Sequence, residues 1–442
     1  MPYAAAVTDA VANLVARFAP SRWRVAFSGG LDSTVLLHAL QANAPGRVDA
    51  LHVAHGLQPE VTSEWTQSVQ ASAAEMGVAV RILDVRVDLD SDRGIEASAR
   101  DARYLALADE ISDDECLLTA QHADDQAETL LLQLLRGAGP AGLSGMPFSA
   151  NFGRGRLLRP LLDVRRADIE AYGLAHGLQW FDDPSNNDYA FDRNYLRGQV
   201  MPVIERRWPA ATKTIARAAR WQQHASVELD RIGLSDWRLA LGISHEVASC
   251  DRLSRLDERR LGNALRAGCR ALGLVVPNQA RLASVSRLVR GHSGRGLVAW
   301  DGGTARRYRD QLFFLPPLPE EPEGFTSVWD GQCPLHLPAG LGRLSLSVRP
   351  EGAVSLRCHF REPAISVLDG DRPRHSFAAW CQERCIPPWA RTRIPLLSVD
   401  EDLVAIGCHK LAAWPDSLRR SALIWQAKPD LGLSGLTASG IF

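Results

Sequence analysis

The stretch Phe27-Ser28-Gly29-Gly30-Leu31-Asp32-Ser33 joins an apolar, β-prone segment, Trp23 to Phe27, to a segment of helical character, Ser33 to Leu40. Glycine permits the tight backbone that a strand-to-helix turn requires. Such a turn directs several backbone N–H groups to one point, at the positive end of a helix dipole. The stretch therefore predicts a phosphate-binding loop, to which Ser28 and Ser33 add hydroxyl donors.

The spacing within this loop excludes two common nucleotide motifs. A Walker-type loop requires G-x-x-x-x-G-K-[ST], and the stretch has no lysine; the dinucleotide spacing G-x-G-x-x-G is also absent. An acid beside a phosphate cradle repels phosphate unless a cation lies between them, so Asp32 predicts a Mg²⁺ site. A glycine turn without a ligand is the alternative interpretation.

Composition places the 442-residue chain among ordinary globular proteins of two or three domains, with 46% hydrophobic and 23% charged residues. It has no run of eighteen apolar residues, and residues 1–20 lack the features of a signal peptide, so we expect a cytoplasmic protein without a membrane span. None of the eight cysteines forms a C-x-x-C pair, which favours free thiols. A metal site is the alternative interpretation for Cys381, Cys385, Cys408 and His409, but their spacing is not a usual zinc pattern.

The net charge of −1 conceals an asymmetry along the chain. Residues 1–200 contain 17 Arg and no Lys against 27 Asp and Glu, a formal charge of −10, and residues 201–442 carry +9. A basic second part is typical of a protein that binds a polyanion. A chance difference between two solvated surfaces is an equally weighted alternative.

Strand-like and helix-like segments alternate through the first part of the chain. We expect strands at 48–55, 78–85 and 115–119, and helices at 62–76, 94–110 and 124–136. This alternation predicts an α/β fold with a doubly wound parallel sheet. Ligands of such sheets bind at the carboxyl ends of the strands, so we expect Ser28, His55 and Gln121-His122 along one edge.

The pattern changes beyond Leu157. A helix is expected at 165–177, residues 204–290 look mostly helical and rich in arginine, and the proline-rich stretch 315–322 reads as a linker. Residues 325–430 look strand-rich, with one helix at 376–384. We therefore expect three domains: an α/β domain with the phosphate loop at 1–200, a helical domain at 201–315 and a smaller α+β domain at 325–430, the last two binding a polyanion if the charge asymmetry is functional.

A second polar cluster follows the predicted strand 115–119. His122, Asp125 and Glu128 stand where that strand ends and a helix begins, and the two acids are three residues apart, on one helical face. Acids in a first turn also suit the helix dipole, so an N-cap cluster is the alternative interpretation.

The motifs together resemble a known enzyme family. The glycine loop resembles the pyrophosphate loop of the N-type ATP pyrophosphatases. Further segments, in the same order along the chain, resemble the long, three-domain form of tRNA(Ile)-lysidine synthetase: Gln121 to Gly145, Asp183-Pro184-Ser185-Asn186, Arg193-Asn194, Ile386 to Arg391, and Pro395-Leu396-Leu397. One departure is that this family usually has several lysines before the Pro-Pro-Trp motif, where this chain has Arg374 to Trp380; Arg372, Arg374, Arg384, Arg391 and Arg393 could substitute.

The resemblance implies a reaction in two steps. ATP adenylates the C2 oxygen of the wobble cytidine in tRNA(Ile) with a CAU anticodon, releasing pyrophosphate. The ε-amine of free lysine then attacks C2 and expels AMP, giving lysidine. ATP and Mg²⁺ are the implied cofactors, and the enzyme class is a ligase that forms a C–N bond.

The resemblance also implies residue roles. The expected ATP-binding set is Ser28, Gly29, Gly30, Leu31, Asp32 and Ser33, with Asp32 also the metal ligand. The expected catalytic set is Asp32, Arg100, His122, Asp125 and Glu128, where Arg103 is the alternative to Arg100. The expected tRNA-binding set is Arg193, Asn194, Arg197 and Arg391, of which the first three could instead brace the domain.

Three other functions are weighed against this one. A tRNA thiolase with the same loop commonly needs catalytic cysteines or an iron–sulfur cluster, and the loop domain has only Cys116. An amidotransferase synthetase would need a glutaminase domain, which is not evident. An RNA-binding protein without catalysis would not require the intact stretches Ser28 to Ser33 and His122 to Glu128.

Overall fold

The computed structural model describes residues 2–54, 59–86, 95–181, 189–241, 247–291, 293, 295–351, 354–360, 366–367, 375–400 and 402–427. The chain forms two compact units, Met1–Val227 and Glu228–Phe442. The break falls inside one long helix, α10 (Ala211–Ala240), and the three domain boundaries expected from the sequence remain a prediction. The expected site residue His55, the segment 183–186, and Arg372 and Arg374 lie outside the described residues.

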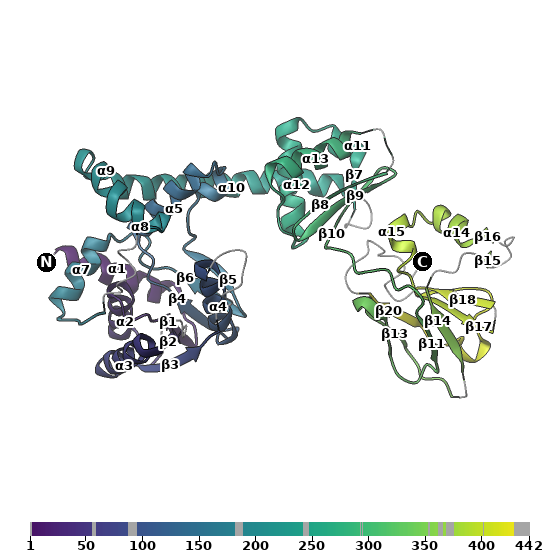
Figure 1. The fold of residues 1–442 in the computed structure, drawn as a ribbon, viewed down its shortest axis with the longest axis horizontal. Helices are drawn as coiled ribbons and strands as arrows, with labels where there is room; N and C mark the ends of the chain where they lie inside the picture. The colour runs from purple at the N-terminus through teal and green to yellow at the C-terminus, as the bar shows by residue number, and fades with distance from the viewer. Residues whose placement is uncertain are drawn as a thin grey trace. The chain divides into compact units, whose positions relative to one another are not determined.

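Unit 1 is built on a six-stranded sheet in the order β3-β2-β1-β4-β6-β5 (Figure 1). Its strands are β1 (Arg22–Ala26), β2 (Val48–Ala54), β3 (Ala79–Asp84), β4 (Glu115–Leu118), β5 (Ser149–Phe152) and β6 (Gly155–Leu158). All neighbouring pairs are parallel except β5–β6. The parallel sheet confirms the α/β expectation. The β5–β6 hairpin was not expected, because its short polar and glycine-rich sequence has little strand periodicity.

Helices cover both faces of this sheet, which makes it doubly wound. They are α1 (Pro2–Arg17), α2 (Leu31–Asn43), α3 (Pro59–Glu75), α4 (Ile95–Asp109), α5 (Ala123–Leu135), α6 (Pro140–Leu143), α7 (Arg166–Ala175), α8 (Asp192–Tyr195), the π-helix η2 (Leu196–Val200) and α9 (Met201–Arg207). One core cluster packs Trp23 and Val25 of β1 against helices that include α1, α2 and α7. A second packs Leu51 and Leu117 against α4. The N-terminal helix α1 is an element that the sequence analysis did not predict.

Unit 2 combines helices with antiparallel sheets. Its helices after α10 are α11 (Cys250–Ser254), α12 (Glu258–Ala271), α13 (Gln279–Arg290), α14 (Phe377–Glu383) and α15 (Pro388–Arg391), with 3-10 turns η3 (Pro338–Gly340) and η4 (Asp416–Leu418). A four-stranded sheet, β7-β10-β9-β8, packs with α11 to α13. It consists of β7 (Ala248–Ser249), β8 (Arg295–Trp300), β9 (Gly303–Tyr308) and β10 (Gln311–Leu315). The expected helical domain at 201–315 thus also contains a sheet.

The remainder of unit 2 is rich in strands, as expected. One sheet has the order β11-β14-β17-β18-β19, a second β12-β13-β20, and β15 pairs with β16. The strands are β11 (Thr326–Trp329), β12 (Leu335–His336), β13 (Arg343–Leu346), β14 (Leu356–His359), β15 (Ser366–Val367), β16 (His375–Ser376), β17 (Leu396–Val399), β18 (Asp402–Ile406), β19 (His409–Lys410) and β20 (Leu423–Gln426). Helix α14 matches the helix expected at 376–384.

Two glycines of α12 should respond oppositely to alanine. A Cβ on Gly268 would lie 2.6 Å from the buried ring of Trp237 in α10, whereas one on Gly262 meets nothing closer than 3.7 Å. We expect Gly268→Ala to destabilise unit 2 by about 1–3 kcal/mol through overpacking. Gly262→Ala should stabilise it by up to about 1 kcal/mol through helix propensity. Denaturant unfolding measures both, and equal effects would contradict the packing of α12 on α10.

Candidate active site

The glycine loop lies between β1 and α2, as the sequence predicts. Gly29 has a φ of +83°, a backbone conformation that favours glycine. The Ser28 and Ser33 hydroxyls are 3.0 Å apart, and the Ser33 Oγ accepts the Ser28 N–H at 3.2 Å. Helix α2 begins at Leu31 without a side-chain cap, so the N–H groups of its first turn are open to an anion.

Two aromatic residues hold the carbonyl groups of this loop. The Trp65 Nε1–H donates to the Ser28 carbonyl at 2.6 Å, and the Phe181 N–H donates to the Gly29 carbonyl at 2.9 Å. Their rings pack with centroids 4.5 Å apart. A Cβ on Gly29 would lie 2.8 Å from Val69 Cγ2. The sequence analysis missed Trp65 and Phe181; the available signal for Trp65 was that it is the one aromatic residue of the expected helix 62–76.

The loop and the second polar cluster meet at His122, between β4 and α5. The His122 Nε2 lies 3.7 Å from Asp32 Oδ2 and 3.5 Å from Asp125 Oδ2, and Nδ1 lies 3.5 Å from Asp124 Oδ2. At these distances the attraction is mainly between charges. Asp125 Oδ2 also accepts the His122 backbone N–H at 3.0 Å, as in an N-cap cluster. The N-cap interpretation and a chemical role are therefore compatible.

The three acids determine the charge of His122. Burial of the ring lowers its pKa, but contacts with Asp124 and Asp32 and the charge of Asp125 outweigh this and raise the pKa from 6.5 to about 10. His122 is therefore an imidazolium at neutral pH in the protein without ligands. An imidazolium is suited to attract an anion or to donate a proton, rather than to accept one.

A compact charge cluster joins α5 to α8 and η2. The Arg193 guanidinium bridges Asp125 Oδ1 at 2.9 Å and Glu128 Oε2 at 2.8 Å. Arg197 bridges the same two carboxylates at 3.1 and 2.7 Å. Glu128 is only 2% exposed. These contacts fit the bracing interpretation of Arg193 and Arg197. Their contact with tRNA, like that of Asn194, remains a prediction.

Arg100 lies beside a buried arginine that the sequence analysis missed. The Arg100 guanidinium is 5.3 Å from the ring centroid of Tyr104. Arg159, just after β6, donates through Nη1 to the Pro147 carbonyl at 2.8 Å, and its buried Nε has no partner among the described residues. Burial lowers the pKa of Arg159 and the charge of Arg100 lowers it further, against the raising effect of Tyr104. The choice of Arg100 over Arg103 as the active-site arginine remains a prediction. An arginine directly after the apolar run Leu157-Leu158 was the signal for Arg159.

Asp32 has the free oxygen that a cation requires. Its Oδ1 is buried and accepts no hydrogen bond from the described part of the chain. Mg²⁺ commonly binds through one or two carboxylates together with substrate phosphates, so a single free carboxylate oxygen beside a phosphate loop fits that ion. Within the described residues there is no group of three or more His, Cys, Asp or Glu placed to hold a metal, and none of the eight cysteines forms a disulfide.

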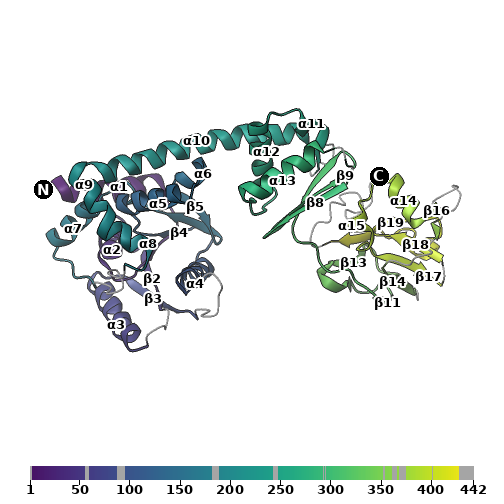
Figure 2. The same cartoon turned by 45° about the horizontal axis from the view of Figure 1, so that its top comes forward.

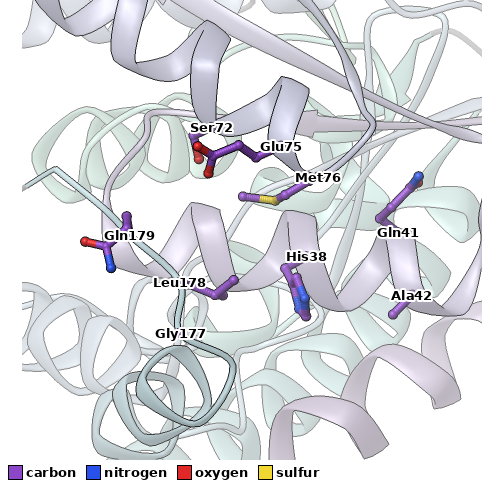
Figure 3. A pocket seen from close by; sticks show the side chains of 9 residues that line it. All are labelled: His38, Gln41, Ala42, Ser72, Glu75, Met76, Gly177, Leu178 and Gln179. Carbon is purple, nitrogen blue, oxygen red and sulfur yellow. The ribbon is translucent and has the colours of Figure 1, made fainter.

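A pocket in unit 1 and Arg391 in unit 2 involve residues other than those of this cluster. A pocket of about 420 Å³ is lined by His38 and Gln41 near the end of α2 and by Glu75 and Met76 at the end of α3 (Figure 3). It is at the opposite end of α2 from the loop and contains none of the expected site residues.

Arg391, in α15 of unit 2, donates to the Ile386 carbonyl at 2.9 Å and to the Tyr308 hydroxyl at 3.2 Å. Its contact with tRNA remains a prediction.

Comparison with protein families covers most of the chain. Residues 4–204 match a PP-loop domain, residues 249–313 a TilS substrate binding domain, and residues 354–420 a TilS substrate C-terminal domain. In the described part of the chain, no helix is long and apolar enough to cross a membrane.

Similar proteins extend over nearly the same length. The chain is 41% identical to the tRNA(Ile)-lysidine synthase of Alkalilimnicola ehrlichii, over 87% of this chain and 89% of that protein. It is 39% identical to that of Methylococcus capsulatus, over 88% and 91%, and 37% identical to that of Xanthomonas campestris, over 93% and 95%. A solved U34-tRNA thiolase, NcsA of Methanococcus maripaludis, matches 50% of this chain and 80% of its own at 16% identity and a TM-score of 0.40, which is too low to carry an argument.

The charge of His122 should make stability depend on pH. Because its pKa is raised from 6.5 to about 10, its contribution is complete below pH 6.5 and is lost as the pH rises through about 10. We expect the free energy of unfolding of unit 1, measured with EDTA present, to fall between pH 6.5 and 10. His122→Gln should flatten this dependence. Parallel pH profiles for the two proteins would show that His122 is not charged in the folded state.

The hydrogen bond from Trp65 should matter for ATP affinity. Trp65→Phe keeps a ring against Gly29 but removes the N–H donated to Ser28, so we expect ATP binding to weaken by about 2- to 10-fold, the value of one hydrogen bond. Trp414→Phe is a matched control, since its Nε1–H donates to the Leu418 carbonyl in unit 2. Calorimetric titration with ATP measures both. Equal ATP affinity in Trp65→Phe and the wild type would contradict the proposal that the Trp65 N–H positions the loop for ATP.

Proposed function

The chain belongs to the tRNA(Ile)-lysidine synthase family, and we propose that it carries out the family's reaction with the residues described above. The substrates of the proposed reaction are ATP, free L-lysine and tRNA(Ile) with a CAU anticodon, and the compartment is the cytoplasm. The observation that carries the proposal is the meeting of the loop and the second motif at His122, which lies within 3.7 Å of both Asp32 and Asp125.

The first step makes the C2 oxygen of the wobble cytidine a leaving group. That oxygen attacks the α-phosphorus of ATP, the bond to the β-phosphate breaks, and pyrophosphate leaves. The loop N–H groups at the start of α2 would hold the pyrophosphate charge. Arg100 and the His122 imidazolium would attract the phosphate groups. Mg²⁺ held by Asp32 would neutralise phosphate charge when bound.

The second step joins lysine to the activated base. The uncharged ε-amine attacks C2, AMP leaves with the former C2 oxygen, and one proton is released. The cluster of Asp125, Glu128, Arg193 and Arg197 has both signs of charge, as the zwitterion of lysine has. Its carboxylates would bind an amino group and its guanidinium groups the lysine carboxylate. A carboxylate of this cluster is also better placed than the protonated His122 to accept the proton.

The remaining functional proposals concern tRNA and the thiolase alternative. The three domains expected at 1–200, 201–315 and 325–430 would divide catalysis from tRNA binding, with residues 201–442 and their charge of +9 providing most of the phosphate contacts.

Cys116 is buried on β4, and burial raises the pKa of its thiol. It is therefore a poor nucleophile, which disfavours thiolation.

The direct test is nucleoside analysis of the product. CAU-anticodon tRNA(Ile) is incubated with the protein, ATP, Mg²⁺ and lysine, digested to nucleosides and examined by mass spectrometry. We expect cytidine at the wobble position to be replaced by lysidine only when ATP and lysine are both present. Unchanged cytidine, with tRNA binding intact, would support the non-catalytic alternative, and a thionucleoside formed with a sulfur donor would support the thiolase.

Asp32 should be essential for adenylation but not for folding. Asp32→Ala removes the free oxygen proposed for Mg²⁺ and no core packing, so we expect pyrophosphate release to fall by roughly a hundredfold or more while the protein remains folded. Asp9→Ala, at an exposed acid of α1, is the control. Normal turnover by a folded Asp32→Ala protein would contradict the proposed Mg²⁺ site.

A further inference from the structure

A basic surface with exposed tryptophans crosses α9 and the first half of α10. Residues 206–227 contain five Arg or Lys and no Asp or Glu, although residues 1–200 carry a charge of −10. The side chains of this basic aromatic surface, all exposed, are Arg206, Arg207, Trp208, Lys213, Arg217 and Trp221. Such a local concentration of cations in an acidic unit indicates a surface for a polyanion.

The two tryptophans of this surface are unusually open to solvent. Trp208 is 61% exposed and Trp221 is 63% exposed. At 100° per residue, Trp221 lies on the side of α10 opposite the buried Thr212, Ala216 and Ala219. It therefore makes no contribution to the core of unit 1, and its ring presents a face to the solvent.

Each tryptophan has an arginine over its ring. The Arg207 guanidinium lies 5.9 Å from the ring centroid of Trp208, and that of Arg217 lies 5.6 Å from that of Trp221. Aromatic rings and guanidinium planes are the groups on which unpaired RNA bases stack, while arginine and lysine bind the adjoining phosphates. Because residues 206–227 combine these rings with five cations and no acid, the surface is suited to single-stranded RNA.

Hydrogen bonds and ion pairs connect this surface to the elements that carry the candidate active site. Glu205, at the end of α9, accepts from Arg165 at 3.2 Å and from Thr212 at 2.6 Å. The Arg166 N–H, next along the chain, donates to Asp124 at 2.8 Å, beside His122. Helix α9 also follows η2 directly, where Arg197 binds Glu128. Figure 2 shows α8 and α9 beside the beginning of α10.

We propose that Trp208 and Trp221 stack on unpaired bases of the tRNA anticodon loop, and that Arg206, Arg207, Lys213 and Arg217 hold the phosphates around them. This inference rests on the proposed function, because the reacting base lies in that loop. Stacking fixes the loop next to His122 without reading the sequence of the neighbouring bases. Catalysis and ATP binding do not involve these two side chains.

The test compares tRNA binding by the full-length protein and its variants. One base stack contributes enough that each of Trp208→Ala and Trp221→Ala should weaken tRNA binding by roughly 5- to 100-fold, and Trp→Phe should restore much of it. The salt dependence of binding should be unchanged in the Trp→Ala proteins, whereas Arg217→Gln should reduce the salt slope by about 1. Leu174→Ala, at a leucine of α7 that is 67% exposed, is the control and should bind like the wild type.

Kinetics separate this surface from the active site. The double variant Trp208→Ala/Trp221→Ala should raise the KM for tRNA with the KM for ATP and lysine unchanged, and its thermal stability should equal that of the wild type because both rings are exposed. Affinity of the double variant within twofold of the wild type would overturn the proposal. So would a wild-type dimer that the double variant abolishes without a change in tRNA affinity, since the surface would then serve a second copy of the chain. If the wild type bound tRNA through these tryptophans but formed no lysidine, the proposed function would fail and the surface would stand.

Discussion

Two carboxylates at the start of α5 impose the main constraint on unit 1. Both Glu128 and Asp125 are buried. Burying a charged carboxylate costs free energy unless groups of opposite charge pair with it. Arg193 and Arg197 supply those charges from α8 and η2, with five N–O contacts between 2.7 and 3.1 Å. The cluster therefore holds α8 and η2 against α5, which follows β4, and α9 continues directly from η2.

The same cluster is connected through His122 to the glycine loop. Asp125 lies 3.5 Å from the His122 ring, and His122 in turn lies 3.7 Å from Asp32 of the glycine loop. A continuous row of charged groups thus runs from the phosphate site to the proposed lysine site. Because the signs alternate along this row, each of its buried or half-buried charges has a partner of opposite sign.

Local sequence patterns predicted much of this arrangement. The glycine loop, the strand–helix alternation and the position of His122 at a strand end all follow from short-range signals, and the structure contains them. Helix α1, the β5–β6 hairpin and strands β8 to β10 were missed. The hairpin depends on pairing with β4 rather than on its own periodicity, and the arginines of β9 obscure its alternation. Trp65, Phe181 and Arg159 act on the site through tertiary contacts, which a spacing of residues cannot reveal. The pairing of Arg193 with Asp125 spans 68 residues, so charge alone did not indicate it.

In the proposed reaction the site activates tRNA before lysine takes part. The most direct measurement is exchange of labelled pyrophosphate into ATP with unmodified CAU-anticodon tRNA(Ile), with and without lysine. Reversible adenylation of the wobble base predicts exchange that requires the tRNA and does not require lysine. Exchange without any tRNA would place the adenylate on another acceptor, and absence of exchange until lysine is added would contradict an adenylated tRNA intermediate.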